Sequence, residues 1–382
     1  MAQCLAGKPP DRLPPVLLEE PCGQALFGIW VEGLADRFDE ALCEIYTRLF
    51  AHAVVHADAT ADAEELVARY RRVRHARRVS GEPRRIFVLS RVTLGADVAV
   101  TSVLMDAARK RFPRAELIFV GPRKNYEMFA AGTGIRHAPL EYRRGSLCDR
   151  LAAAAELRKV ASEQDSLVID PDSRFTQLGL VPVCAEDSYR FFESRAYGGA
   201  SDQPLPELAA AWAQATFGIE DAKPFVALPP ASWHESGVSV SFGVGENPSK
   251  RIADPFEEEL LALLAKTGDC LVIDTGAGGA EAERVRCAVA RSGVQARLWE
   301  GSFAGFASLM AGSRLYVGYD SAGGHVAAAC GLPLISIFAG FPSPRMFARW
   351  RPSGAQASVI RVDRPDPAAT LDRVQEALAT HG

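Results

Sequence analysis

The sequence predicts an α/β protein with two doubly wound parallel-sheet domains that face a cleft and follow a helical N-terminal extension. Three observations favour this fold class. The chain has 382 residues, more than one hydrophobic core usually serves. Short apolar runs typical of buried strands alternate with helical segments, and this alternation occurs in two successive sets. A segment with several prolines and glycines, residues 198–224, separates the sets and predicts the domain connection.

The composition excludes several classes of protein. A hydrophobic content of 48% and a charged content of 24% are ordinary for a globular protein. The net charge of -4 argues against bulk binding of nucleic acid. No apolar run reaches the roughly 18–20 residues that cross a bilayer, and no secretory signal is evident, so a cytoplasmic protein is expected. The eight cysteines are scattered without a CxxC pair, which argues against a zinc or iron–sulfur knuckle and fits reduced, mostly buried thiols. No metal and no other cofactor are expected.

Residues 1–82 form the predicted N-terminal extension. The first twenty residues are Pro-rich, and apolar residues at 23–53 recur at helical spacing. A second helical stretch at 62–78 begins with acids and ends with arginines, which suits the helix dipole. This arginine cluster is either a solvated helix face or a contact to an anionic acceptor or membrane surface.

Residues 83–222 form the first predicted α/β domain. Its strands are predicted at 84–90, 115–121 and 166–171, and its helices at 101–112, 124–132 and 146–163. Residues 172–200 are too irregular for an assignment. A strand, a helix and a strand within about forty residues indicate a parallel sheet with a crossover helix.

Residues 223–382 form the second predicted domain. Strands are predicted at 237–245, 269–276, 296–301, 315–319 and 332–340, and helices at 255–268, 280–293, 303–313 and 366–381. The run FVALPP at 225–230 is an extra strand or a linker. The small residues at 321–330 predict a short helix between two strands, which completes a βαβ unit.

Candidate functional residues follow predicted strands, where open α/β sheets usually bind ligands. Asp97, at a helix start in the first domain, is either a helix cap or a general base for an incoming hydroxyl. In the second domain Lys250 and Arg251 follow a strand and two glycines. They either face an anion or are surface cations, and the GxxxxGK[ST] pattern of a P-loop is absent.

Two further loops complete the candidate site. Glu281 or Glu283, after the strand that ends near Asp274, is either a ribose-binding acid or a first-turn acid of the helix. The segment Asp320–His325 places a carboxylate and glycines before a helix whose N-terminus suits an anion. His325 is either structural or a neutral hydrogen-bonding group. Together these residues favour a nucleotide-activated donor in the second domain and a hydroxyl acceptor facing Asp97.

Several motifs resemble glycosyltransferase family 9, the bacterial heptosyltransferases of lipopolysaccharide core biosynthesis. The segment DSAGGHVAAACGLPLISIFAG, from residue 320, resembles the family's D-[ST]-G-x-x-H segment. PSKRI resembles its K-[RH]-W-P segment and GAGGAEAE its G-G-x-x-E loop. SRVTLGADVAVTSVLMDAARKRFPRAELIFVG resembles its N-terminal motif, in which Gly-Asp is contiguous, whereas Ala96 here separates Gly95 from Asp97. The resemblance spans residues 84–354, in the family's order.

The resemblance implies a GT-B fold with two Rossmann-like domains and inverting, metal-independent sugar transfer from a nucleotide-sugar donor. Asp97 would be the catalytic base. The donor-binding residues would be Lys250, Arg251, Glu281, Asp320, Ser321, Ala322, Gly323, Gly324 and His325. An ADP-heptose-like donor and a glycan or lipid-linked acceptor, such as lipopolysaccharide core, follow from the same resemblance. A peripheral contact with the inner membrane surface is part of this expectation.

Two other functions are compatible with the same residues. A non-catalytic nucleotide-sugar-binding scaffold would keep the fold without transferring the sugar. A nucleotide-sugar epimerase would act on the donor without an acceptor. A nicotinamide dehydrogenase is disfavoured, because no G-x-G-x-x-G follows the first strand of either domain.

Overall fold

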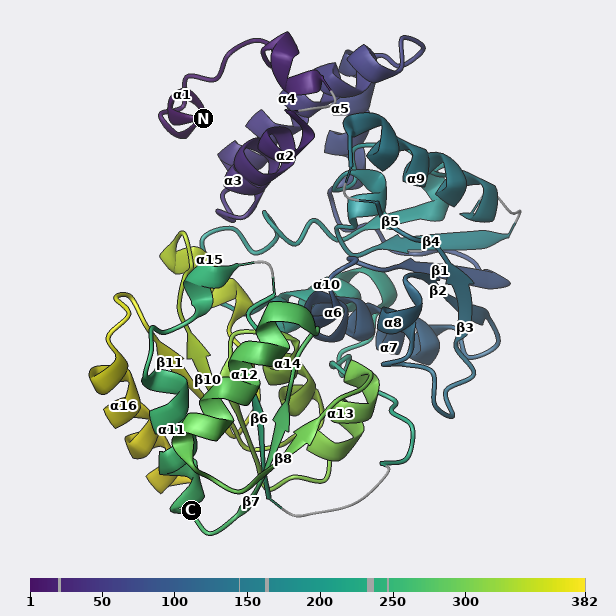
Figure 1. Cartoon of the computed structure of the whole chain (residues 1–382). Coiled ribbons are helices and arrows are strands. Elements are labelled where there is room, and N and C mark those ends of the chain that lie inside the picture. Colours follow the sequence, from purple (N-terminus) through teal and green to yellow (C-terminus); the bar gives the residue numbers. More distant parts are fainter. Residues whose placement is uncertain (20–21, 144, 162–164, 232–236, 246, 382) are drawn as a thin grey trace. The chain divides into compact units, whose positions relative to one another are not determined.

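The fold is described from a computed structural model of the chain. It covers residues 1–19, 22–143, 145–161, 165–231, 237–245 and 247–381. The chain divides into two compact units (Figure 1). The first comprises Met1–Tyr126 and Gly134–Pro224, and the second Glu127–Thr133 and Phe225–Gly382. Each unit is described by itself below.

The first unit is built on a five-stranded sheet in the order β3-β2-β1-β4-β5, and every neighbouring pair is parallel. Its strands are β1 (Arg85–Leu89), β2 (Glu116–Gly121), β3 (Arg136–Pro139), β4 (Ser166–Asp170) and β5 (Tyr189–Phe191). Its helices are α1 (Ala2–Leu5), α2 (Gly23–Ala25), α3 (Glu32–Ala35), α4 (Glu40–Ala57), α5 (Ala63–Val73), α6 (Leu94–Ala96), α7 (Ser102–Arg111), α8 (Arg123–Tyr126), α9 (Leu147–Ala161) and α10 (Leu205–Phe217).

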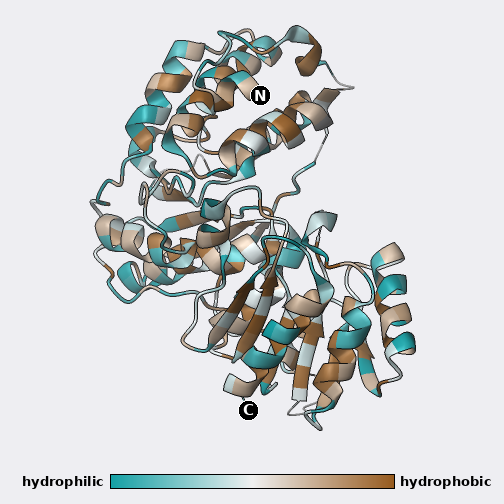
Figure 2. Cartoon of the chain, turned by 90° about the vertical axis from the view of Figure 1, so that its left-hand side faces the viewer, coloured by the Kyte–Doolittle hydropathy of each residue, from teal (hydrophilic) through white to brown (hydrophobic). Residues whose placement is uncertain are grey.

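The N-terminal helices share one hydrophobic core with this sheet. Tyr46 and Phe50 of α4 belong to the same buried cluster as Phe87, Leu89 and Val168 of the central strands. Successive side chains of a strand point to opposite faces, so Phe87 and Leu89 mark the face that α4 and α9 cover. The strands are hydrophobic, whereas the helices carry hydrophilic outer faces (Figure 2). The extension therefore supplies part of the helical cover that a parallel sheet requires.

The second unit contains a six-stranded parallel sheet in the order β11-β10-β9-β6-β7-β8. Its strands are β6 (Gly237–Ser241), β7 (Cys270–Asp274), β8 (Ala296–Trp299), β9 (Leu315–Tyr319), β10 (Leu334–Phe338) and β11 (Ala357–Arg361). Its helices are α11 (Phe256–Ala265), α12 (Gly279–Ser292), α13 (Phe303–Met310), α14 (Ala322–Ala329), α15 (Pro344–Trp350) and α16 (Pro367–Thr380).

Both sheets have a topological switch point, where the chain reverses the direction in which strands are added. It lies between β1 and β4 in the first unit and between β6 and β9 in the second. Ligands of open α/β sheets bind outside the carboxyl ends of the strands at such a point. The second switch point is formed by the segments that begin at Phe242 and Asp320, which include predicted site residues.

The predicted α/β class is confirmed, and the central strands lie where the apolar runs placed them. Three strands were not predicted: β3, β5 and β11, each at the edge of a sheet. β3 and β11 are partly exposed and lack a long apolar run, and β5 is buried but only three residues long, so the sequence carries little signal for them. The helix predicted at 124–132 is limited to α8. Residues 225–230 form no strand, although Ala227 donates to Met128 O at 2.7 Å.

Candidate functional site

The start of α14 is the centre of the candidate site in the second unit. Ser321 precedes the helix with an extended backbone, and its side chain caps none of the first-turn N–H groups. A Cβ at Gly323 would lie 2.1 Å from Tyr316 Oη, so only glycine lets the helix begin this close to the sheet. The first turn thus keeps backbone donors and the positive end of the helix dipole available to an anion.

Lys250 places a positive charge beside this helix start. Its Nζ donates to Asp320 Oδ2 at 2.5 Å and to the Asp320 carbonyl oxygen at 3.2 Å. The lysine side chain keeps 19% exposure, whereas that of Asp320 keeps 6%. Lys250 is therefore oriented by a buried carboxylate while its ammonium can still reach a ligand. The structure thus brings Lys250 together with Asp320–His325.

Three hydroxyl groups beneath α14 are buried without a hydrogen-bond partner in the described part of the chain. They belong to Tyr316, Ser321 and Ser336. Tyr316 Oη lies close to the hydroxyls of Ser321 and Ser241, and burial raises the pKa of Tyr316. Buried polar groups in folded proteins are nearly always hydrogen-bonded. An unsatisfied cluster at a helix start therefore marks a place where a ligand or water completes the bonding.

His325 lies on α14 and is 6% exposed. Burial, with a smaller contribution from the Lys250 charge, lowers its pKa to about 4, although Asp320 opposes the shift. The imidazole is therefore neutral at physiological pH. Its ring packs edge-on against Trp350, with 6.0 Å between the ring centres.

Glu281 lies over the turn that follows β7. Its Oε1 accepts from Ala277 N at 3.0 Å. A Cβ at Gly276 would lie 1.8 Å from the same oxygen, and one at Gly243 would lie 3.6 Å from it. The glycines of two neighbouring loops, after β6 and β7, thus leave room for this carboxylate. Glu283, the alternative acid, instead accepts from the Cys287 thiol at 3.7 Å.

Asp274 is a site residue that the sequence analysis did not single out. It ends β7, and its Oδ1 accepts from Gly276 N at 3.1 Å, next to the amide that Glu281 binds. Burial raises its pKa to about 6, and the Glu281 charge adds to the shift. The sequence signal that could have identified Asp274 was its place as an acid at the end of a predicted strand, where open α/β sheets bind ligands.

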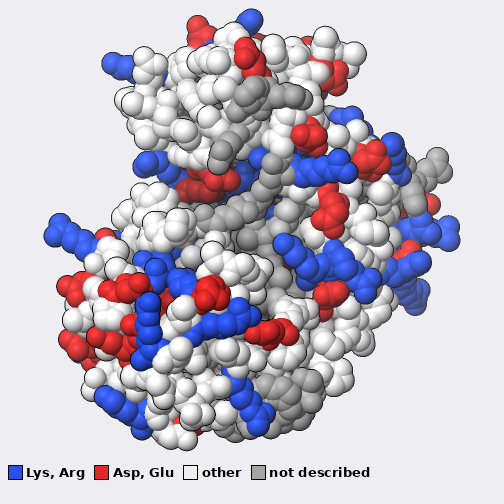
Figure 3. Space-filling model, viewed as in Figure 1, with Lys and Arg blue, Asp and Glu red and all other residues white. Residues whose placement is uncertain are grey.

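Arg251 does not join Lys250 at the helix start. Its side chain bonds Asp254 and Glu257, and Glu257 also accepts from Arg284, whose Nη2 donates to the Phe242 carbonyl at 2.9 Å. Acidic and basic residues lie side by side on this face (Figure 3) and line a groove of about 240 Å³ between α11 and α12. Glu257 is 2% exposed, so it is a buried link between the Lys250 loop and the helix of Glu281.

Asp97 belongs to the first unit and is completely buried. Its Oδ1 accepts from Arg91 N at 2.7 Å and from Thr101 Oγ1 at 2.6 Å. Its Oδ2 accepts from Ser90 Oγ at 2.5 Å and from Asn125 Nδ2 at 2.6 Å. Burial raises the pKa of Asp97, while these four hydrogen bonds oppose the shift. The Asp97 carboxylate therefore anchors the loop after β1.

The backbone around Asp97 is unusual in two places. Residues Asp97–Thr101 form a π-helical turn, the local structure that one extra residue in an α-helix produces. Ala96, the residue that separates Gly95 from Asp97, directly precedes this turn. Val92 has φ +70, a strained conformation for a β-branched side chain. Such strain is frequent in functional loops.

The other carboxylates at this end of the first sheet are also buried and bonded. Asp170 accepts from Ser173 N, Thr176 and Tyr189 at 2.5–2.6 Å. Asp172 accepts from Ser194 at 2.6 Å and pairs with Arg195. Each of these groups has partners within the unit.

Neither a metal centre nor a membrane helix is found in the described residues. They contain no group of three or more His, Cys, Asp or Glu side chains arranged to hold a metal ion. Every helix among them is too short or too polar to cross a bilayer.

Comparison of the fold with solved structures identifies the structural class of this chain. A glycosyltransferase family 9 protein from Veillonella parvula DSM 2008 superposes with a TM-score of 0.59 at 13% identity, over 78% of this chain and 97% of that one. E. coli heptosyltransferase WaaC with ADP-2-deoxy-2-fluoro heptose superposes with a TM-score of 0.60 at 17% identity, over 78% of this chain and 100% of that one. E. coli ADP-heptose lps heptosyltransferase II superposes with a TM-score of 0.54 at 17% identity, over 78% of this chain and 99% of that one. The chain has the GT-B fold.

The sequence comparison points to one family within that class. Residues 253–378 match Glycosyltransferase family 9 (heptosyltransferase), a segment that holds Glu281 and all of Asp320–His325. The predicted resemblance to this family is confirmed over this segment, which excludes the Asp97 motif, and it supports a glycosyltransferase. Lys250 and Arg251 lie just before the matched segment. No curated protein matches the chain.

Proposed function

We propose that the chain transfers a sugar from a nucleotide diphosphate donor to a hydroxyl acceptor, and that the second unit binds the donor. One observation carries this proposal: the uncapped start of α14, with Lys250 directed to it and unsatisfied hydroxyls below it. These groups suit a diphosphate, because backbone N–H groups and an ammonium ion both stabilise phosphate oxygens.

The same groups provide a chemical role during transfer. As the bond between the anomeric carbon and the diphosphate breaks, negative charge grows on the leaving phosphate. Lys250 and the helix dipole stabilise that charge where it develops. Direct attack by the acceptor hydroxyl on the opposite side of the anomeric carbon inverts its configuration. The proposed reaction is therefore inverting and metal-independent.

Asp97 is the proposed base that removes the proton of the acceptor hydroxyl. In the structure each of its two carboxylate oxygens already accepts two hydrogen bonds. A base must come within about 3 Å of the proton that it abstracts. The Ser90–Val92 loop, which carries two of the donors, therefore has to open before Asp97 can act.

The donor and acceptor are proposed from the relatives. WaaC was solved with an ADP-heptose analogue, which supports an ADP-heptose-like donor. The similarity to E. coli ADP-heptose lps heptosyltransferase II supports a glycan or lipid-linked acceptor of the lipopolysaccharide core type. With such an acceptor the protein would work in the cytoplasm, in peripheral contact with the inner membrane.

A second function is favoured by the burial of Asp97. If the Ser90–Val92 loop stays closed, the chain binds a nucleotide-sugar and does not transfer it. Both functions share the donor site and differ only in the acceptor step.

Calorimetry and thermal shift with ADP-, GDP-, UDP- and CMP-sugars test donor binding, because a ligand of the native state raises the melting temperature. Product analysis with acceptor extracts then tests transfer. Asp97→Ala should abolish transfer and leave donor affinity within about 3-fold, since Asp97 lies outside the proposed phosphate site. Wild-type transfer rates in Asp97→Ala would disprove the base. Donor binding without consumption in any extract would favour the second function.

A further inference from the structure

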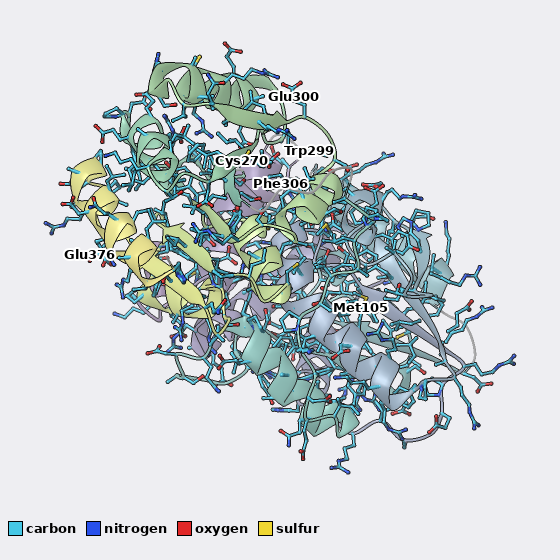
Figure 4. The ribbon with its side chains drawn as sticks, turned by 90° about the horizontal axis from the view of Figure 1, so that it is seen from below. Met105, Cys270, Trp299, Glu300, Phe306 and Glu376 are labelled. Carbon is cyan, nitrogen blue, oxygen red and sulfur yellow. The ribbon has the colours of Figure 1, made fainter. Side chains whose placement is uncertain are left out.

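Glu257 is a buried carboxylate of the second unit that the proposed reaction does not involve. It lies in the first turn of α11 and keeps 2% exposure. Charged side chains normally lie at the surface, as Glu376 of α16 does (Figure 4). An acid in a first turn suits the helix dipole, but the neighbouring Glu258 and Glu259 meet that need without full burial. The burial of Glu257 therefore requires another explanation.

Two arginines compensate the buried charge, and both bond the same carboxylate oxygen. Glu257 Oε1 accepts from Arg251 Nε at 3.1 Å and from Arg284 Nη1. Glu257 Oε2 is buried without a hydrogen-bond partner in the described residues. An ion pair is strong where water is excluded, and breaking it there leaves an unpaired charge. Glu257 therefore fixes the positions of both arginine side chains.

The first arginine belongs to the loop that carries Lys250. Arg251 follows Lys250 directly, and the next N–H along the chain donates to Tyr319 Oη at 3.3 Å. Tyr319 immediately precedes Asp320, whose carboxylate accepts from Lys250 Nζ. Asp320 thus directs the lysine ammonium. The contacts to Glu257 and Tyr319 hold the backbone from which the lysine extends.

The second arginine belongs to α12, the helix that carries Glu281. Arg284 lies three residues after Glu281, and its Nη2 donates to the carbonyl oxygen of Phe242 at 2.9 Å. Phe242 opens the connection from β6 to α11, and Arg251 lies near the end of the same connection. Glu257 therefore holds the segment that carries Lys250 near both of its ends, through Arg284 at the start and directly at Arg251.

We infer that Glu257 is a positioning residue for the donor diphosphate, because through Arg251 and Arg284 it holds the β6–α11 connection so that Lys250 reaches the start of α14. This inference rests on the proposed donor site and adds a residue that acts through Lys250. It also assigns a role to Arg251, which positions the lysine and does not itself bind the anion. Direct binding of phosphate by Arg251 predicts the opposite result, because release of Arg251 from Glu257 would then strengthen anion binding.

Calorimetry on the full chain tests the inference with inorganic pyrophosphate and with the tightest of ADP, GDP, UDP and CDP. Glu257→Gln keeps the shape of the side chain and removes its charge. Affinity for both probes should fall by about 5-fold to 10-fold, as expected for a network residue without ligand contact. Arg251→Ala should cause a similar loss. It leaves the Glu257–Arg284 pair in place, so it tests the inference even if Glu257→Gln does not fold.

A double-mutant cycle separates positioning from a general structural effect. In a Lys250→Ala background, Glu257→Gln should change nucleotide affinity by less than about 2-fold, because no lysine remains to be positioned. A merely structural role would lower affinity equally in both backgrounds. Glu258→Gln is the matched control, since Glu258 lies in the same turn and also accepts from an arginine of α12, Arg291. This control should keep nucleotide affinity within about 2-fold of wild type.

Three results would overturn the inference. They are unchanged affinity in Glu257→Gln or Arg251→Ala, a gain of affinity in Glu257→Gln, and an equal loss in both backgrounds of the cycle. If Lys250→Ala weakens binding while Glu257→Gln does not, the donor site stands and the positioning role alone is wrong. If wild type binds neither nucleotides nor pyrophosphate, the proposed donor site fails, and the inference fails with it.

Discussion

The carboxyl ends of the two sheets use polar residues in opposite ways. In the first unit Asp97, Asp170 and Asp172 are buried, and each accepts hydrogen bonds from neighbours in the same unit. In the second unit Tyr316 and Ser321 are buried without partners in the described residues, and α14 begins without a side-chain cap. A satisfied network fixes a loop, whereas an unsatisfied one is completed by a ligand. The contrast therefore lies between the carboxylates of the first unit, which are hydrogen-bonded, and the hydroxyls at the α14 start, which are not; Asn125 Oδ1, beside Asp97, is also buried without a partner in the described residues.

The largest expected effect tests whether the first network is structural. Asp97→Ala removes the acceptor of four hydrogen bonds, and each buried donor left unpaired costs about 1–3 kcal/mol. We expect the free energy of unfolding to fall by about 3–5 kcal/mol, measured by chemical denaturation. Asp202→Ala, at an exposed loop acid, is the control and should change stability by less than about 0.5 kcal/mol. A similarly small loss in Asp97→Ala would show that the network does not anchor this unit.

The second-largest expected effect tests the contribution of Lys250 to anion binding at the start of α14 in the second unit. Lys250→Ala removes the ammonium at the α14 start, and a hydrogen bond to a charged group contributes about 1.5–3 kcal/mol. Affinity for the tightest nucleoside diphosphate should fall by about 10-fold to 100-fold in calorimetry of the folded variant. Lys266→Ala, at the end of α11, should leave the affinity unchanged. Unchanged affinity in Lys250→Ala would place the diphosphate elsewhere.

A smaller effect tests whether the buried carboxyl group of Asp274 in the second unit lowers the stability of the folded chain. The folded pKa of Asp274, about 6, is above the ordinary value of 3.8, so its ionisation opposes folding. This destabilisation is absent below about pH 4, where Asp274 is protonated in both states, and is complete above about pH 6. Asp274→Asn should therefore be more stable than wild type by about 1–2 kcal/mol at pH 7.5 and equal to it near pH 4. Melting curves at both pH values measure the difference, and a pH-independent gain would contradict this cause.

The smallest effect concerns the strained loop that Asp97 anchors. Val92 has φ +70, which disfavours a β-branched side chain, while asparagine tolerates this conformation. Val92→Asn should raise the free energy of unfolding by about 0.5–1 kcal/mol in chemical denaturation. Val92→Ala keeps the unfavourable conformation and should give no gain. If Asn destabilises the unit as much as Ala does, packing of the valine outweighs the strain.

Much of the proposed donor site was predictable because its signals are local. Apolar runs placed β6, β7, β9 and β10, and ligands bind where such strands end. Lys250 and Asp320–His325 were therefore found from the segments that follow the strands, and the structure brings them together. Arg251 follows the same strand, yet its side chain turns to Glu257. The direction of a side chain depends on neighbours distant in sequence, which no local pattern contains.

The sequence by itself determined the two α/β units, the central strands and the segment that begins α14, because periodicity and strand-end position are local properties. Only the tertiary structure decided which polar groups are satisfied. Two of the four donors of Asp97 come from the Ser90–Val92 loop after β1, one from the π-helical turn and one from α8. Asp274 and Glu281 come together because neighbouring amides of the glycine turn after β7 donate to one oxygen of each acid. Hydrogen-bond satisfaction is a property of packing, so the closed first network and the open second one became visible only in the folded chain.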